Sequence, residues 1–295
     1  MSGGSLRLAV ALNGYGLERR DGSREVLAWD EIAGLARLAE ELGYEAIFAP
    51  EIAGWEAFTL LTGIGAHTER IGLTSGVVPL SARDPSRLAM GAASLQELSG
   101  GRFTLGLGSR ESIERTKAAL VELRGLIDEG RGTDWVGAPR PTPVYLAALG
   151  PRMTELAGQA ADGVILNWCT PERVAAARAA IPRREGFTIA VYVRACLSHV
   201  DEHAAEALRI AASRYASMES YRRQFEAMGV DASDPAAVAA RTCVAGEWDA
   251  AIARLREYAE AGADVVVVYP VPAGEAVSSL TGTLMAAAPK GGLEG

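Results

Sequence analysis

A glycine and a proline mark a candidate anion-binding turn in the middle of the chain, at Gly150-Pro151. They stand between an apolar, strand-like segment and a helix-like one. Gly150 permits a sharp turn, and Pro151 suits the first position of a helix. The N–H groups of Arg152, Met153 and Thr154 would then point at an anion, to which the Arg152 guanidinium would add a charge. The pattern predicts a phosphate cradle, with an ordinary helix start as the alternative.

A carboxylate gives the second candidate for chemistry. Glu51 follows the apolar segment that ends at Ala49, and the early part of the chain has no other carboxylate in such a position. A side chain placed there could exchange a proton with a substrate. We expect Glu51 to be a general acid or base, with a surface helix cap as the alternative.

A pair of histidines forms a rival signal. His199-x-x-x-His203 formally matches an inverted zinc-protease pattern, with Cys196 three residues upstream. Asp201, however, is well placed as a helix cap, and a partner carboxylate motif is not evident on a following helix. We expect a solvated helix start here and no metal site.

Eight apolar strands must position these residues. Segments 41–49, 99–108, 159–167 and 260–269 each run from a helix end through a small turn into a short apolar strand. Four further strands are expected within 6–12, 71–78, 144–148 and 188–195. Strands that are apolar on both faces and alternate with helices indicate a parallel sheet covered by helices. The fold class is therefore α/β, a (β/α)8 TIM barrel, in one domain spanning residues 1–295.

Two features refine this barrel. Asp84-Pro85, Gly150-Pro151 and Thr170-Pro171 predict three helix starts. Residues 201–245 predict a helical insertion between strands 7 and 8, with a break over 229–235.

The barrel predicts where the site lies, because active sites of this fold form at the carboxyl ends of the strands. Those ends are Asn13, Glu51, 76–78, 109–111, 148–153, 167–169, 194–199 and 269–270. The set holds few strong acids and no evident nucleophile paired with a base. Such a rim suits a cofactor that brings its own chemistry.

Composition narrows the partners. A net charge of −8 without a basic tract argues against nucleic acid and anionic membrane surfaces, so we expect a small-molecule substrate. No apolar run approaches the roughly twenty residues of a membrane span, and the first residues lack the regions of a secretory signal. Three cysteines without paired spacing suit a reducing compartment. We expect a cytoplasmic protein.

Taken together, several segments resemble the bacterial luciferase-like family of flavin and deazaflavin oxidoreductases, above all its coenzyme F420-dependent members. The matching stretches are 41–48, 68–77, Arg83-Asp-Pro, 98–108, 148–153, 161–168 and 260–264. The run Leu-Ser-Gly-Gly-Arg-Phe followed by Gly-x-Gly is the most specific of them. The resemblance implies a (β/α)8 barrel, a hydride-transferring oxidoreductase and a homodimer.

The resemblance also implies roles for individual residues. Gly76-Val77 would form a bulge, often with a cis peptide bond, behind the deazaflavin ring, and Glu51 stands where many relatives carry an acid or a histidine. The implied cofactor-binding positions are Gly76, Val77, Ser109, Ala147, Ala148, Leu149, Gly150, Arg152, Met153, Asn167, Trp168 and Cys169.

One departure keeps two alternatives open. Relatives usually have a long segment after strand four, whereas here Gly108-Ser109-Arg110 runs almost directly into a helix. The pocket would then be more open, or covered by the insertion or a partner subunit. The alternatives to an F420-dependent enzyme are a flavin mononucleotide (FMN) monooxygenase and a non-catalytic barrel that has lost its cofactor.

Overall fold

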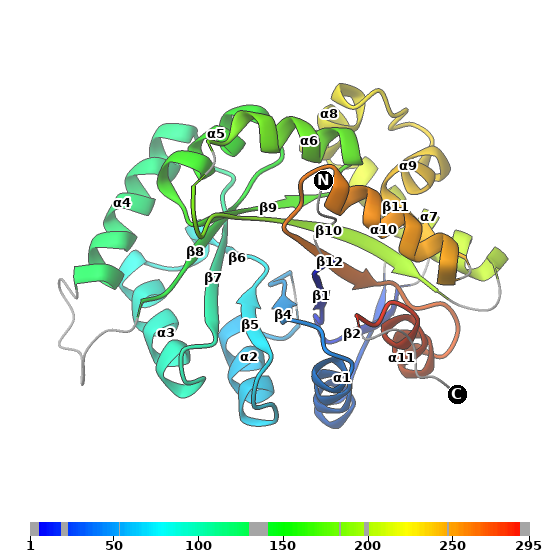
Figure 1. Cartoon of the computed structure of the whole chain (residues 1–295), viewed down its shortest axis with the longest axis horizontal. Helices are drawn as coiled ribbons and strands as arrows, with labels where there is room; N and C mark the ends of the chain where they lie inside the picture. Colours follow the sequence, from blue (N-terminus) through cyan, green and yellow to red (C-terminus); the bar gives the residue numbers. More distant parts are fainter. Residues whose placement is uncertain are drawn as a thin grey trace.

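Eight parallel strands close into a barrel (Figure 1). The computed structural model describes residues 6–18, 23–52, 54–129, 141–182, 184–197, 201–246 and 248–289. In barrel order the strands are β1 (Leu8–Ala11), β4 (Ala46–Ala49), β5 (Gly72–Ser75), β7 (Phe103–Gly108), β8 (Val144–Ala147), β9 (Gly163–Asn167), β10 (Thr188–Cys196) and β12 (Val265–Pro270). β12 pairs with β1 and closes the ring, which confirms the predicted (β/α)8 fold.

Three smaller pairings decorate the barrel. β6 (Val78–Pro79) pairs with β7, and β11 (Cys243–Ala245) pairs with β10. β2 (Tyr15–Glu18) and β3 (Arg24–Val26) form an antiparallel hairpin after β1.

Helices surround the barrel (Figure 1). They are α1 (Trp29–Glu41), α2 (Ala57–Ala66), the short 3-10 helix η1 (Leu80–Ala82), α3 (Pro85–Leu98), α4 (Ile113–Glu129), α5 (Pro151–Ala160), α6 (Pro171–Ala180), α10 (Trp248–Glu260) and α11 (Ala276–Ala286). The three predicted starts at proline are confirmed, and Asp84 caps α3 by accepting from the N–H of Ser86. In the described part of the chain, no helix is both long and apolar enough to cross a membrane.

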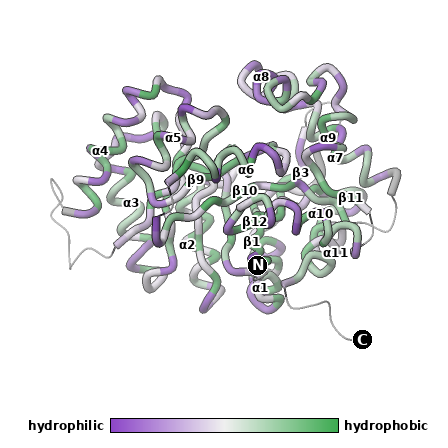
Figure 2. The backbone as a smooth tube through the Cα atoms, turned by 45° about the horizontal axis from the view of Figure 1, so that its top comes forward, coloured by the Kyte–Doolittle hydropathy of each residue, from purple (hydrophilic) through white to green (hydrophobic). Residues whose placement is uncertain are grey.

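The strands alternate between two cores, as their apolar faces require. On β10, Ala190 and Tyr192 point into the barrel, whereas Val191 and Val193 pack under the surrounding helices. Figure 2 shows hydrophobic colour along central strands such as β9 and β10 and hydrophilic colour over parts of outer helices such as α8. This alternation decides which side chains face the mouth of the barrel.

The predicted insertion is helical. It comprises α7 (Asp201–Ala216), α8 (Glu219–Ala227) and α9 (Pro235–Thr242), followed by β11. The predicted break lies between α8 and α9, where Gly229 has a φ of 69°. A hydrophobic cluster of its own, centred on Phe225, joins the insertion to the buried Trp168 behind β9.

Candidate active site at the barrel mouth

The mouth has two halves of opposite character. Inward positions at the ends of β5 and β7 are glycines, Gly76, Gly106 and Gly108, and with the start of α5 they form what we call the glycine half. Inward positions at the ends of β9, β10, β12 and β1 carry large polar side chains. This arginine half consists of Asn167, Arg194, Tyr269 and Asn13.

The glycines allow chain segments to approach closely. A Cβ on Gly106 would lie 1.9 Å from the carbonyl oxygen of Ser75, and one on Gly76 would lie 2.0 Å from the hydroxyl of Tyr192. That hydroxyl donates to the carbonyl of Gly76 at 2.7 Å. The Gly76–Val77 peptide bond is cis, as the resemblance implies, and Val77 is half-buried beside Tyr192 in the interior cluster.

The start of α5 is open. Gly150 is its N-cap, and a Cβ built there would meet nothing within 4 Å. The N–H groups of Arg152 and Met153 have no acceptor within the helix. The prediction for Thr154 is wrong, because its N–H donates to the carbonyl of Gly150 at 3.1 Å.

The other predicted positions around α5 differ in accessibility. The carbonyl of Leu149 accepts from Arg173 at 3.3 Å, and the exposed Arg152 approaches Glu114 at 3.8 Å. Leu149 and Ala147 are half-buried, and Ala148 is 2% exposed. Backbone groups and Arg152, rather than apolar side chains, are therefore available to an anion here.

Ser109 lies in the short connection from β7 to α4, which is as brief as predicted. Its hydroxyl contacts that of Thr116 at 2.7 Å and accepts from the N–H of Glu111 at 3.1 Å. Local hydrogen bonds thus orient this side chain at the mouth.

Asn167 joins the arginine half to the insertion. Its amide oxygen accepts from Arg194 and its amide nitrogen donates to the hydroxyl of Tyr221 at 2.8 Å. The side chains of the next two residues are buried. Trp168, with φ of 53°, packs in the insertion cluster, and Cys169 lies in the main core, both at 0% exposure. Burial raises the pKa of the Cys169 thiol to about 11, outweighing the nearby charges of Arg173 and Arg194.

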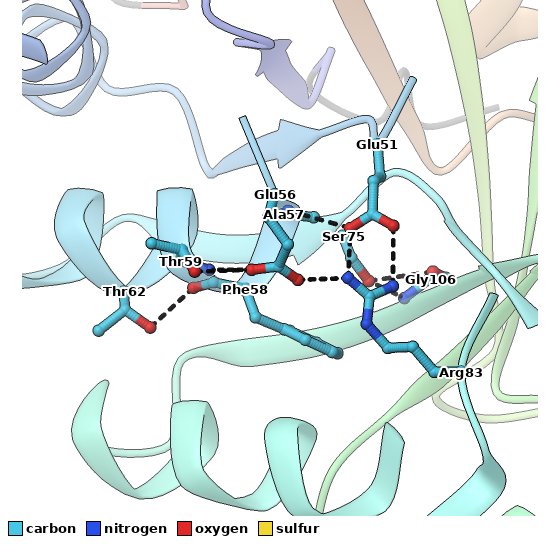
Figure 3. A network of polar contacts seen from close by, with 9 residues as sticks. All are labelled: Glu51, Glu56, Ala57, Phe58, Thr59, Thr62, Ser75, Arg83 and Gly106. Atoms are coloured by element: carbon cyan, nitrogen blue, oxygen red, sulfur yellow. Dashed lines mark hydrogen bonds and ion pairs between the residues drawn. The ribbon is translucent and has the colours of Figure 1, made fainter. Parts of the chain in front are cut away.

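Glu51 is held by an arginine (Figure 3). Its two carboxylate oxygens accept from the two terminal nitrogens of Arg83 at 2.8 and 2.7 Å, and one also accepts from the N–H of Ala57 at 3.1 Å. Arg83 contacts Glu56 as well. Burial alone would raise the pKa of Glu56, but hydrogen bonds from Thr59 and the charge of Arg83 lower it overall. The Glu51 hydrogen bond is the main reason that the pKa of Arg83 is raised.

The alternative zinc pattern falls partly outside the described residues, which include neither His199 nor the side chain of Asp201. Within the described parts, no group of three or more histidine, cysteine, aspartate or glutamate side chains could hold a metal ion.

Three arginines shape the site beyond what the sequence indicated. Arg83 binds Glu51, Arg173 binds the turn before α5, and Arg194 fills the arginine half. Of these three arginines, the sequence analysis placed only Arg194 at the carboxyl end of a strand, and it assigned Arg194 no role. A signal did exist for Arg194, because a cation at an inward position of an otherwise apolar strand requires a partner.

Comparison with known proteins agrees with this architecture. A family model for luciferase-like monooxygenases matches residues 10–118 and 109–265. A 5,10-methylenetetrahydromethanopterin reductase of Methanolobus tindarius is 30% identical over 208 residues, 60% of this chain and 64% of the relative. An F420-dependent glucose-6-phosphate dehydrogenase of Nakamurella multipartita is 29% identical over 181 residues, 48% of this chain and 53% of the relative. These matches span only about half to two-thirds of the relatives.

Solved structures share the fold over nearly the whole chain. An F420-dependent secondary alcohol dehydrogenase bound to an F420–acetone adduct superposes with a TM-score of 0.72 at 14% identity, covering 96% of this chain and 99% of the other. An EDTA monooxygenase of Chelativorans superposes with a TM-score of 0.74 at 16% identity, covering 97% and 93%. The matched residues of the family model exceed half of the chain, and the chain belongs to the luciferase-like monooxygenase family.

Proposed function

We propose that this protein is a coenzyme F420-dependent oxidoreductase that transfers a hydride between the deazaflavin and a small organic substrate. The observation that carries the proposal is the open start of α5 beside a barrel mouth whose inward positions at the ends of β5 and β7 are glycines. The curated relatives named above include an F420-dependent dehydrogenase, which favours F420 over FMN as the cofactor.

The residues present fit such a cofactor. A phosphate needs backbone N–H donors and positive charge, which the N–H groups of Arg152 and Met153, the helix dipole of α5 and the Arg152 guanidinium supply. No side chain fills the space at Gly150. A flat ring needs a surface with little side chain, which the glycine half provides.

When bound, the deazaflavin supplies a carbon that accepts or donates a hydride. The protein then has to bind, orient and exclude water. We assign binding of the phosphate to α5 and support of the ring to Gly76 and Val77. The proton-donor role of Glu51 stays a prediction, because both of its oxygens accept from Arg83 and this geometry supports a role in fixing the loop before α2.

Parallel titrations with F420 and FMN, followed by cofactor fluorescence, test the proposal. The wild type is expected to bind F420 with micromolar or tighter affinity and FMN more weakly. Gly150→Glu places a carboxylate where the phosphate would lie, so F420 affinity should fall about tenfold or more, roughly 1.4 kcal/mol. Gly282→Glu, on the exposed side of α11 with open space at its Cβ, is the matched control and should bind as the wild type does.

Other outcomes would replace the proposal. Preferential binding of FMN would favour the monooxygenase, and binding of neither cofactor would favour the non-catalytic barrel. Equal loss of F420 affinity in Gly150→Glu and Gly282→Glu would indicate that the phosphate does not bind at α5.

The proposal includes a cytoplasmic homodimer. Three buried cysteines that form no disulfide support a reducing compartment. Sedimentation should give twice the chain mass of 30.9 kDa, and a mass equal to one chain would contradict the dimer.

A further inference from the structure

A buried tyrosine spans the inside of the barrel. Tyr192 on β10 is 4% exposed, its side chain points into the barrel, and its hydroxyl donates to the carbonyl of Gly76 at 2.7 Å. Gly76 follows β5, which lies opposite β10 in the closed sheet, because β7, β8 and β9 separate the two strands on one side and β4, β1 and β12 on the other. The hydrogen bond therefore joins opposite walls of the barrel.

Packing and protonation make this hydroxyl a fixed donor. The Tyr192 ring lies edge-on to Phe48, with 5.8 Å between the ring centres, and to Tyr269, with 5.9 Å. Burial raises the pKa of Tyr192 well above its ordinary value, although the charge of Arg194 lowers it. At neutral pH the phenol therefore keeps its proton, and it has a single O–H to donate. That O–H is directed at the Gly76 carbonyl.

Two further hydrogen bonds hold the Gly76–Val77 segment from the β4 side. The Gly76 N–H donates to the carbonyl of Ala49 at 2.9 Å, and the Val77 carbonyl accepts from the N–H of Glu51 at 3.3 Å. Ala49 ends β4 and Glu51 follows it, so both bonds come from the neighbouring strand and its loop. Tyr192 complements them by holding the segment from the opposite wall.

The Tyr192 hydroxyl also limits how far the segment can sink toward the barrel interior. A Cβ on Gly76 would lie 2.0 Å from the hydroxyl oxygen and 3.1 Å from the Cβ of Phe48. The Gly76 backbone thus rests directly on these two side chains. Without the hydroxyl, the buried Gly76 carbonyl would lose its donor. Because an unsatisfied buried carbonyl is costly, the segment would then shift toward another donor.

A second buried tyrosine makes the same kind of bond away from the mouth. Tyr44 is 3% exposed, and its hydroxyl donates to the carbonyl of Leu284 on α11 at 2.8 Å. Burial raises the pKa of Tyr44 as well. Tyr44 precedes β4, so it lies at the amino ends of the strands, opposite the mouth. The hydroxyls of Tyr44 and Tyr192 therefore share their chemistry but differ in their place relative to the candidate site.

We infer that Tyr192 is a positioning residue of the cofactor site. Its hydroxyl fixes the height of Gly76 and Val77 at the mouth, and with it the surface that supports the deazaflavin ring. Tyr192 acts through Gly76 and contacts no reacting atom in this assignment. The effect on the ring rests on the proposed function, whereas the effect on the segment does not.

F420 titrations of Tyr192→Phe and Tyr44→Phe test the effect on the ring. Each variant removes one hydroxyl from a bond of nearly equal length, so the urea midpoints of both should fall to a similar extent. Only Tyr192→Phe should weaken F420 binding, by about fivefold or more, because the surface under the ring shifts. It should also shift the absorption maximum of bound F420 relative to the wild-type complex, a change that Tyr44→Phe should not produce.

Hydrogen exchange without cofactor tests the effect on the segment. In Tyr192→Phe, the amides of residues 76–78 should exchange about tenfold faster than in the wild type, because the Gly76 carbonyl has lost its donor. In Tyr44→Phe these amides should exchange as in the wild type. If Tyr192→Phe does not fold, Phe48→Leu takes its place. That variant keeps the hydroxyl but removes one ring that fixes it, and it should speed exchange of the same amides about threefold.

Three results would decide against one or the other proposal. Unchanged exchange at residues 76–78, or F420 affinity and absorption in Tyr192→Phe equal to those of the wild type, would overturn the inference. Equal loss of F420 affinity in both tyrosine variants would overturn it too, since a general loss of stability would then explain the result. A wild type that does not bind F420, with faster exchange in Tyr192→Phe alone, would contradict the proposed function while confirming that Tyr192 fixes the segment.

Discussion

The two halves of the mouth differ in which groups occupy the space at the strand ends. In the glycine half, neighbouring backbone and the Tyr192 hydroxyl occupy the space that a Cβ would need at Gly106 and Gly76. In the arginine half, side chains of Asn13, Arg194 and Tyr269 extend into the mouth and contact one another. The glycine half offers backbone donors, a surface with little side chain and the exposed Arg152, and the arginine half offers large polar side chains around the buried Arg194.

Under the proposed function, this difference would suit the two halves to different ligands. A cofactor shared by many relatives needs a surface built from backbone, which tolerates little change. A substrate is distinguished by side chains, because these can vary without altering the strands. The Arg83 ion pair lies near the glycine half and is neutralised by Glu51, whereas the buried Arg194 of the other half has its hydrogen bond to the neutral amide of Asn167.

The largest effect is expected from a methyl group in the glycine half. Gly106→Ala places a Cβ 1.9 Å from a backbone oxygen that cannot move without displacing β5, so the free energy of unfolding should fall by about 3 kcal/mol or more. Urea unfolding measures it. The control Gly282→Ala, in a helix with open space, should raise the free energy of unfolding by about 0.5 to 1 kcal/mol. An unchanged urea midpoint in Gly106→Ala would contradict the explanation that neighbouring backbone leaves no room for a Cβ at Gly106.

Glu51→Gln tests the neutralised arginine. The variant replaces a charged partner of Arg83 whose side chain is only 18% exposed, and we expect a loss of about 1 kcal/mol in unfolding free energy. Glu56→Gln, at a side chain that is 41% exposed, should lose less. The proton-donor role predicts in addition that Glu51→Gln loses one limb of the pH–rate profile, and a profile of unchanged shape would contradict that role.

Sequence patterns predicted the barrel because each strand is apolar on both faces, a property written in consecutive residues. The same holds for the insertion and for the three helices that begin at proline. The start of α5 was predicted except for Thr154, whose N–H is used by the helix itself. These features depend on residues close together in the chain.

The contents of the arginine half could not be predicted in this way. Arg194 and Asn167 lie 27 residues apart, and the pairing of Arg83 with Glu51 spans 32. The resemblance implied cofactor contacts for Trp168 and Cys169, but it did not reveal that both side chains are fully buried. The contacts within the arginine half depend on the closed barrel, because closure brings the ends of β9, β10, β12 and β1 together.

The smallest expected effect concerns the titration of Cys169, a buried thiol behind the mouth that lies near Arg194. Cys169 is fully buried, and burial raises its pKa to about 11 even though Arg173 and Arg194 favour the thiolate. The unfolded chain titrates this thiol near its ordinary pKa, so the stability it contributes is present below about pH 9 and is lost as the pH rises toward 11. Comparing wild type with Cys169→Ala by urea unfolding, the difference in unfolding free energy should shift by about 0.5 to 1 kcal/mol between pH 7.5 and 9.5. Two results would contradict this expectation: a difference in unfolding free energy that does not change with pH, or rapid labelling of Cys169 by a thiol reagent in the folded protein. Either would mean that the charge of Arg194 stabilises the thiolate in the core. The contrast between a charged mouth and an apolar interior behind it would then fail.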